Sequence, residues 1–182
     1  MKIAIISSSP NKDGLTAACA AAASEAAVMA GHSPVPVDLN TGNIGACRAC
    51  NNGWGTCRET RRCQVLDGFA AAQDTLRECD AYYIVTPVYY GEMSESAKSF
   101  LDRLRRCEAS GRTQGGHMQG KYWILTAAAG GGGGGTLSCL TSLERLVSHL
   151  GGTVFDYIPI TRKSRSYKLK TIADAVEALC AL

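Results

Sequence analysis

Short apolar runs alternate with amphipathic stretches along the chain. Runs rich in β-branched and aromatic residues predict strands over residues 2–6, 33–39, 81–86, 121–127 and 153–158. Apolar residues at helical spacing predict helices over residues 17–30, 67–77, 94–106, 136–150 and 171–182. Strands that alternate with helices in this way indicate a parallel sheet covered by helices.

Side chains near the element ends refine these boundaries. We expect Asp67 and Ser94 to cap the N-termini of their helices, and Thr171 and Asp174 to occupy capping positions of the last helix. The helix that begins at Ser94 ends with cations that complement its dipole: Arg103, Arg105 and Arg106. The helix over residues 136–150 is expected to turn a set of apolar residues inward: Leu137, Leu140, Leu143, Leu146, Val147 and Leu150.

The predicted fold is α/β, a flavodoxin-like doubly wound sheet of five parallel strands in the order 2-1-3-4-5. In such sheets, ligands bind beyond the carboxyl ends of the strands, at the switch point between the first and third strands. The loops after strands one to four are also the stretches of most unusual composition. We therefore expect the functional site at this edge.

Composition narrows the class of protein. A chain of 182 residues suits one domain over residues 1–182, with a cysteine-rich loop over residues 45–64 inserted after the second strand. The net charge of +3 is spread along the chain, which argues against a nucleic-acid partner. Ser24 and Glu25 make the first helix too polar for a membrane span, and we recognise no signal peptide. With nine cysteines, these features favour a reducing cytoplasmic location and no membrane partner.

The loop after the first strand has the features of a phosphate site. Residues 7–16 are dense in hydroxyls and turn formers, and they lead into a helix N-terminus whose N–H groups and dipole attract anions. The G-x-x-x-x-G-K-[ST] pattern is missing, so a monophosphate fits better than ATP. The alternative is an ordinary turn whose hydroxyls cap the helix. The candidate residues are Ser7, Ser9, Asn11, Gly14, Leu15 and Thr16.

The loop after the third strand offers a surface for a flat ring. An isoalloxazine ring needs aromatic or apolar surface and backbone donors. Tyr89, Tyr90 and Met93 supply surface, and Gly91 lets the backbone approach closely. The alternative is a pair of surface tyrosines after a core strand. The candidate residues are Pro87, Val88, Tyr89, Tyr90, Gly91, Met93 and Ser94.

These two loops resemble those of a known family. They read S-x-S-P-x-K-x-G-x-T and T-P-V-Y-Y-G-x-M-S, similar to the phosphate and ring loops of flavodoxin-like NAD(P)H-dependent FMN reductases and iron–sulfur flavoproteins. The resemblance implies FMN as cofactor, with Ser9, Asn11, the Leu15 backbone and Thr16 on its phosphate. At Asn11 and Leu15 the family often has Arg and Asn, so two side-chain contacts are lost here. The resemblance also implies NAD(P)H as electron donor, a flavin, quinone or protein as acceptor, and a homodimer or homotetramer.

Six consecutive glycines follow the fourth strand, over residues 130–135. They match G-x-G-x-x-G formally, and Asp156 lies about twenty residues further on, so a dinucleotide fold remains an alternative. We expect instead a backbone wall beside the flavin pyrimidine, where the family also has a glycine-rich loop. A mobile linker is the other alternative. The candidate residues are Ala129, Gly130 and Gly131.

Four cysteines lie in the loop after the second strand. Cys47, Cys50, Cys57 and Cys63 are spaced C-x2-C-x6-C-x5-C, and four thiolates can hold zinc or a [4Fe–4S] cluster. The spacing is similar to the compact motif of iron–sulfur flavoproteins, with four extra residues before the third cysteine. The alternative is free thiols or a disulfide that shape the loop. The other cysteines are expected in the core: Cys19, Cys79, Cys107, Cys139 and Cys180.

A basic run over residues 162–170 is expected to be a solvated loop, and the alternative is a grip on the 2′-phosphate of NADPH or on an acidic partner. The main hypothesis is an FMN-dependent oxidoreductase with no catalytic side chain, because the cofactor carries the chemistry at its N5 atom. The alternatives are a non-enzymatic flavodoxin-like electron carrier that a partner protein reduces, and a binding module that holds no flavin.

Overall fold

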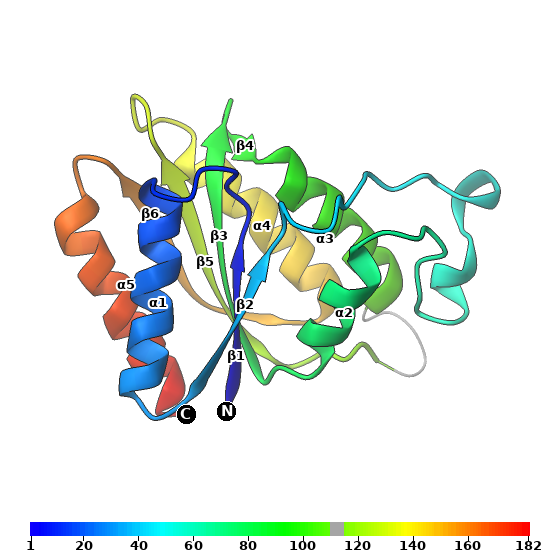
Figure 1. Cartoon of the computed structure of the whole chain (residues 1–182), viewed down its shortest axis with the longest axis horizontal. Coiled ribbons are helices and arrows are strands. Elements are labelled where there is room, and N and C mark those ends of the chain that lie inside the picture. Colours follow the sequence, from blue (N-terminus) through cyan, green and yellow to red (C-terminus); the bar gives the residue numbers. More distant parts are fainter. Residues whose placement is uncertain (110–114) are drawn as a thin grey trace.

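The computed structural model describes residues 1–109 and 115–182 (Figure 1). Its strands are β1 (Lys2–Ser7), β2 (Ser33–Asp38), β3 (Ala81–Tyr89), β4 (Glu92–Met93), β5 (Tyr122–Ala129) and β6 (Thr153–Thr161). Its helices are α1 (Leu15–Met29), α2 (Phe69–Arg77), α3 (Glu95–Glu108), α4 (Thr136–Leu150) and α5 (Arg165–Cys180). Two short 3-10 turns, η1 (Asn51–Gly53) and η2 (Thr56–Arg58), lie in the cysteine-rich loop.

Five of these strands form one parallel sheet in the order β2-β1-β3-β5-β6, and β4 pairs antiparallel with the end of β3. Counting only the parallel strands, this is the order 2-1-3-4-5, so the predicted flavodoxin-like sheet is confirmed. β1 lies between β2 and β3, and its register pairs Ser7 with Asp38 on one side and with Val85 on the other. The switch point is therefore just beyond Ser7.

Helices cover both faces of the sheet. In Figure 1, α1 and α5 lie on one side of it, and α2, α3 and α4 lie on the other. Residues of β1 alternate between the two cores: Ile3 and Ile5 pack with α1 and α5, whereas Ala4 and Ile6 pack with the other three helices. Because both faces are covered, the strands read as continuous apolar runs.

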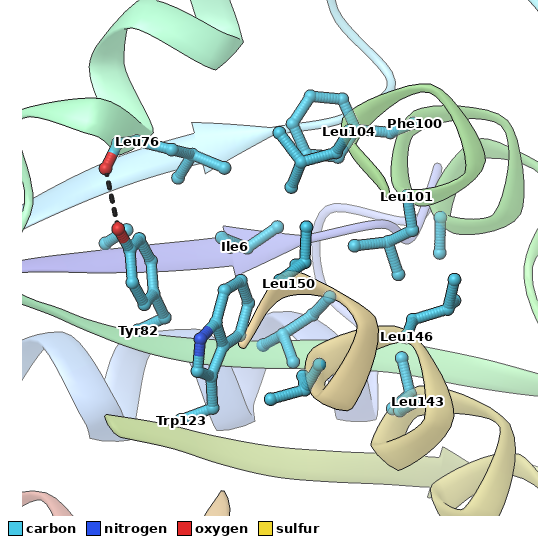
Figure 2. Close-up of a cluster of buried hydrophobic side chains, with 14 of the residues drawn as sticks. Ile6, Leu76, Tyr82, Phe100, Leu101, Leu104, Trp123, Leu143, Leu146 and Leu150 are labelled. Carbon is cyan, nitrogen blue, oxygen red and sulfur yellow. Dashed lines mark hydrogen bonds between the residues drawn. The ribbon is translucent and has the colours of Figure 1, made fainter. Parts of the chain in front are cut away.

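Aromatic side chains fill the larger core, which Figure 2 shows. Tyr82 stacks on Trp123 with 4.2 Å between the ring centroids, and its hydroxyl donates to the Leu76 carbonyl at 2.9 Å. Stacking and a satisfied hydroxyl are the conditions under which a buried tyrosine stabilises a core. The sheet is thus a rigid frame for the loops at its carboxyl edge.

Several elements extend beyond their predicted ends, and two of these extensions change the interpretation. α5 begins at Arg165 and not at Thr171, so most of the basic run is helix, and the solvated loop predicted there is wrong. Thr171 lies inside the helix, where its hydroxyl donates to the Tyr167 carbonyl, and Asp174 pairs with Lys170. β3 continues through the stretch predicted to be a loop, because the chain turns back into β4 and the two strands pair.

The prediction that Arg103 faces the end of its helix dipole is wrong. Its side chain is 1% exposed and forms a bidentate ion pair with Asp67, with nitrogen–oxygen distances of 2.6 and 2.9 Å. Asp67 does not cap α2, whose N-cap residue is Gly68, although its carboxylate accepts from the Phe69 N–H at 3.0 Å. Leu137, predicted to be buried, is 71% exposed at the start of α4.

Candidate functional site

Three loops and the end of β3 converge at the carboxyl edge of the sheet on one cavity of about 340 Å³. The volume lies within the range of about 300–1,000 Å³ that is typical of small-molecule sites. The loops follow β1, β5 and β6, so the cavity sits at the switch point. The residues that line it are Ser9, Asn11, Gly14, Leu15, Thr16, Pro87, Val88, Tyr89, Ala128, Gly130, Gly131 and Arg162.

The floor of the cavity is the N-terminus of α1. Gly14 is its N-cap residue, no side chain caps the helix, and its first turn holds no acid. The predicted hydroxyls are close by: Ser9 is 8% exposed and accepts from the Asn11 N–H at 3.2 Å, and Thr16 is 4% exposed in the first turn. Leu15 is the first helical residue. Uncapped N–H groups beside hydroxyls form an anion site.

The only cation of this loop is turned away from the cavity. Lys12 pairs with Asp38, at the end of β2. Partial burial acts to raise the pKa of Asp38, but hydrogen bonds from Lys12 and Asn40 outweigh it and lower the pKa below its ordinary value. The carboxylate is therefore charged at neutral pH and neutralises Lys12.

The stretch that was predicted to be a loop for the flat ring forms a tight β-hairpin in the structure. Tyr90 and Gly91, with φ of 52° and 82°, form the two-residue turn between β3 and β4. Tyr89 lines the cavity and is 42% exposed, whereas Tyr90 projects fully into solvent. Met93 is buried beneath the hairpin, opposite Val88.

The glycine run contacts this hairpin. A Cβ atom on Gly135 would lie 2.5 Å from the Cα of Gly91, and Gly135 has a φ of 79°. The backbone of the glycine run and the hairpin therefore touch at these two residues, and no larger side chain fits between them. Gly130 and Gly131 line the cavity further along the run, but Ala129 is buried behind it.

Ser94 links the loop after β1 to the start of α3. Its hydroxyl donates to the Ser8 carbonyl at 3.1 Å and accepts from the Ala97 N–H at 3.3 Å, so it caps α3 as predicted. Ser96 donates to the same carbonyl at 3.0 Å. Six predicted site residues thus lie outside the cavity wall, where they support it or face elsewhere: Ser7, Tyr90, Gly91, Met93, Ser94 and Ala129.

The four loop cysteines line a second, much smaller pocket of about 20 Å³ between the cysteine-rich loop and α3. α3 contributes three residues at helical spacing to the same pocket: Arg103, Arg106 and Cys107. Among the described residues, no three Cys, His, Asp or Glu side chains are arranged around a point as ligands of a single metal ion. The four sulfur atoms therefore share a pocket without forming a zinc site.

Two arginines of α3, Arg103 (buried) and Arg106 (half-buried), hold the cysteine-rich loop on this helix. Arg103 donates to the Cys63 sulfur at 3.4 Å and to the Gly45 carbonyl at 3.0 Å. Arg106 donates to the Gly53 carbonyl at 2.5 Å, and its guanidinium lies 4.6 Å from the centre of the Trp54 ring. These contacts fix the loop at several points from one helix face.

Burial, and to a smaller extent the neighbouring thiols of Cys57 and Cys63, raises the pKa of Cys107 to about 12. Cys107 is therefore a neutral thiol at the back of the pocket. Like Cys19, Cys79 and Cys139, it is buried as predicted, whereas Cys180 is half-buried.

The comparison with protein families decides which class of protein this cavity belongs to. A family model described as NADPH-dependent FMN reductase matches residues 1–161. The chain belongs to this family. An iron–sulfur flavoprotein of Methanocaldococcus jannaschii is 29% identical over 105 residues, which cover 58% of this chain and 52% of that protein. The match thus spans about half the length of that relative.

Solved structures confirm the flavodoxin-like fold. RosB, crystallised with the bound intermediate 8-demethyl-8-formylriboflavin-5′-phosphate, superposes with a TM-score of 0.78 at 16% identity, over 100% of this chain and 79% of that one. A flavodoxin from the domain Archaea superposes with a TM-score of 0.64 at 15% identity, over 100% and 97% of the two chains. In the described part of this chain, no helix is long and apolar enough to cross a bilayer.

The cavity has the features that the cofactor of an FMN reductase requires. The uncapped N-terminus of α1 suits a phosphate, Tyr89 offers an aromatic surface, and a Cβ atom on Gly131 would meet nothing within 4 Å, which leaves open space along the glycine run. The lining combines polar residues, such as Ser9 and Thr16, with apolar ones, such as Pro87 and Val88. FMN likewise combines a polar phosphate with a largely apolar ring.

The side chains of the cysteine pocket suit an iron–sulfur cluster chemically, but the pocket is too small to hold one. Four thiols and the guanidinium groups of Arg103 and Arg106 suit an anionic iron–sulfur group. A space of about 20 Å³ holds about one water molecule, which is far less than an eight-atom cluster needs. The pocket as described would have to widen before a cluster could bind.

Several lining residues of the two pockets were not predicted as such, among them Ala128, Cys107 and Arg162. Ala128 is an ordinary strand residue, and Cys107 is one apolar position among several in α3. Neither carries a signal in the sequence that separates it from core residues. Arg162 stood within the basic run, and the only available signal was its place just beyond the end of a strand.

Proposed function

We propose that this chain binds FMN in the cavity at the switch point and uses it to oxidise NAD(P)H. The observation that carries the proposal is the convergence of the loops after β1 and β5 and the end of β3 on one cavity whose floor is an uncapped helix N-terminus. Membership of the NADPH-dependent FMN reductase family supports it. The electrons go to a flavin, a quinone or a protein acceptor.

Each wall of the cavity has a role in this proposal. Ser9, Thr16 and the N-terminus of α1 bind the phosphate, and Tyr89 contacts the ring. When FMN is bound, it supplies the hydride chemistry at its N5 atom, so the protein needs no acid or base there. The role of the protein is to orient the ring beside the glycine run and to leave one face of the ring open to the nicotinamide.

The first test is a visible spectrum before and after reduction. Protein loaded with FMN and freed of excess should be yellow, and under anaerobic conditions NADPH or NADH should bleach its band at about 450 nm without a partner protein. A yellow protein that neither nucleotide bleaches would favour the electron carrier. A protein that retains no FMN would refute the proposal and favour a binding module.

A pair of variants tests the phosphate end. Thr16→Val removes a hydroxyl from the cavity wall with little change in volume, and FMN should bind roughly tenfold more weakly as a result. Thr141→Val is the matched control, because Thr141 is exposed on α4 and its hydroxyl only donates to the Leu137 carbonyl. Equal affinities in the two variants would contradict this assignment.

For the cysteine pocket we propose a [4Fe–4S] cluster on Cys47, Cys50, Cys57 and Cys63, bound after the loop moves outward from α3. The sharing of one pocket by all four sulfur atoms supports this, as does the absence of a carboxylate among the described residues that line it. Iron and acid-labile sulfide in anaerobically purified protein should each approach about four per chain. Iron-free protein whose loop thiols all react with a thiol reagent would refute it.

A further inference from the structure

Arg162, in the turn after the edge strand β6, brings a positive charge to the cavity. It follows β6 directly and lines the cavity together with the phosphate loop and the glycine run. Its guanidinium is the only charged group among the described residues of the cavity wall. A Cβ atom on Gly130 would lie 3.9 Å from its Nη2 atom, so the side chain passes alongside the glycine run.

The turn that carries Arg162 is well fixed. The Ser164 hydroxyl accepts from the Thr161 N–H at 2.9 Å, and the Thr161 hydroxyl accepts from the Ser164 N–H at 3.3 Å. These reciprocal bonds close the turn between β6 and α5, with Arg162 and Lys163 at its tip. Within the described residues, no carboxylate pairs with Arg162.

Among the described residues that line the cavity, none besides Arg162 carries a full positive charge. Lys12 is neutralised by Asp38, and the same loop carries the acid Asp13. The N-terminus of α1 contributes only the equivalent of about half a charge. A phosphate monoester carries close to two negative charges at neutral pH. A cation from outside the loop would balance more of this charge, and Arg162 is the one that lines the cavity.

We propose that Arg162 is the phosphate-binding cation of this site and recognises the 5′-phosphate of FMN from across the cavity. Asn11 and Leu15 provide no charge at the phosphate loop. The guanidinium of Arg162, in the turn after β6, supplies this charge instead. This inference rests on the proposed function. It makes Arg162 the residue that distinguishes FMN from riboflavin, because the two flavins differ only in the phosphate.

The experiment compares both flavins on matched variants. Arg162→Gln removes the charge and keeps hydrogen-bonding capacity, and Lys163→Gln removes the neighbouring exposed charge, which does not line the cavity. Titrations that follow flavin fluorescence should show at least tenfold weaker FMN binding for Arg162→Gln and a riboflavin affinity within about twofold of wild type. Lys163→Gln should match wild type with both flavins.

Raising the ionic strength should weaken FMN binding in the wild type more than in Arg162→Gln, since an ion pair with phosphate is screened by salt. Arg162→Lys should retain part of the FMN affinity, because it keeps the charge and loses the bidentate geometry. Arg162 is exposed, so thermal unfolding of all three variants should stay close to wild type.

The outcomes separate this inference from the function on which it rests. FMN binding to Arg162→Gln at wild-type affinity overturns the inference, and so does an equal loss for FMN and riboflavin. Unchanged FMN binding with a raised KM for NADPH but not for NADH also overturns it, since it assigns the charge to the 2′-phosphate. A wild-type protein that binds neither flavin overturns the proposed function and the inference with it.

Discussion

The contact between Gly135 and Gly91 leads to a sharp prediction about two neighbouring glycines. A Cβ atom on Gly135 would lie 2.5 Å from the Cα and 3.0 Å from the nitrogen of Gly91, and the φ of 79° disfavours any side chain. Gly134 lies in the same run, but a Cβ atom there would meet nothing within 4 Å. Gly135→Ala should therefore destabilise the protein, and Gly134→Ala should not.

The cost of Gly135→Ala has two parts. A left-handed conformation costs an alanine about 1–2 kcal/mol. The contact with the Gly91 backbone is relieved only by displacement of the hairpin or of the start of α4, which costs about 1–3 kcal/mol by analogy with overpacked cores. Together these give about 2–5 kcal/mol, a large part of the 5–15 kcal/mol expected for a domain. Gly134→Ala should change stability by less than about 1 kcal/mol, in the stabilising direction.

Urea unfolding followed by circular dichroism measures the difference. With a slope of about 2 kcal/mol per molar, the midpoint of Gly135→Ala should fall by about 1–2.5 M, and that of Gly134→Ala should hold or rise. Because the hairpin carries Tyr89, Gly135→Ala should also weaken FMN binding. Equal midpoints for the two variants would refute the argument from the close contact.

Three further predictions concern stability. Arg103→Met leaves Asp67 without its buried partner and should lower the free energy of unfolding by about 3–5 kcal/mol in urea, whereas Lys98→Ala, in an exposed pair of the same helix, should change it by less than about 1 kcal/mol. Burial acts to raise the pKa values of Asp67 and Glu108, but hydrogen bonds from arginine outweigh it and hold both below their ordinary values. Their contribution is present above about pH 4.3 and is lost as the pH falls through the folded values, so unfolding free energies measured from pH 7 to 3 should drop only below about pH 4. Tyr90→Asn should raise the free energy of unfolding by about 1 kcal/mol, because Asn tolerates a φ of 52° better and the exposed ring packs on nothing; a loss of stability would contradict this.

The parallel sheet and the place of the cavity could be predicted from the sequence. Strands such as β1 and β3 are continuous apolar runs, as expected for a sheet covered on both faces. Once the strands are parallel and alternate with helices, their carboxyl ends meet at one edge. Loops that are 80 residues apart in the chain, such as those with Ser9 and Tyr89, then fall together without any knowledge of side-chain contacts.

Long-range side-chain contacts could not be predicted in the same way. Arg103 looks like any basic residue near a helix end, and its burial depends on Asp67, which is 36 residues away. α5 begins with Arg165 and has no side-chain cap, although cations disfavour a helix N-terminus. Its start is therefore determined by the turn after β6 and by packing on the sheet. The same turn places Arg162 in the cavity.

Residues of α3 and its N-cap support both pockets, from opposite ends of the same helix. Ser94 and Ser96, at its start, are bonded to the backbone of the phosphate loop, whereas Arg103 and Cys107 face the cysteines about 10–20 Å further along, at 1.5 Å per residue. The two pockets share no lining residue among those described. We therefore expect changes in the cysteine-rich loop to leave the cavity at the switch point unaltered, so the proposed FMN site does not depend on whether the cysteine pocket holds a metal centre.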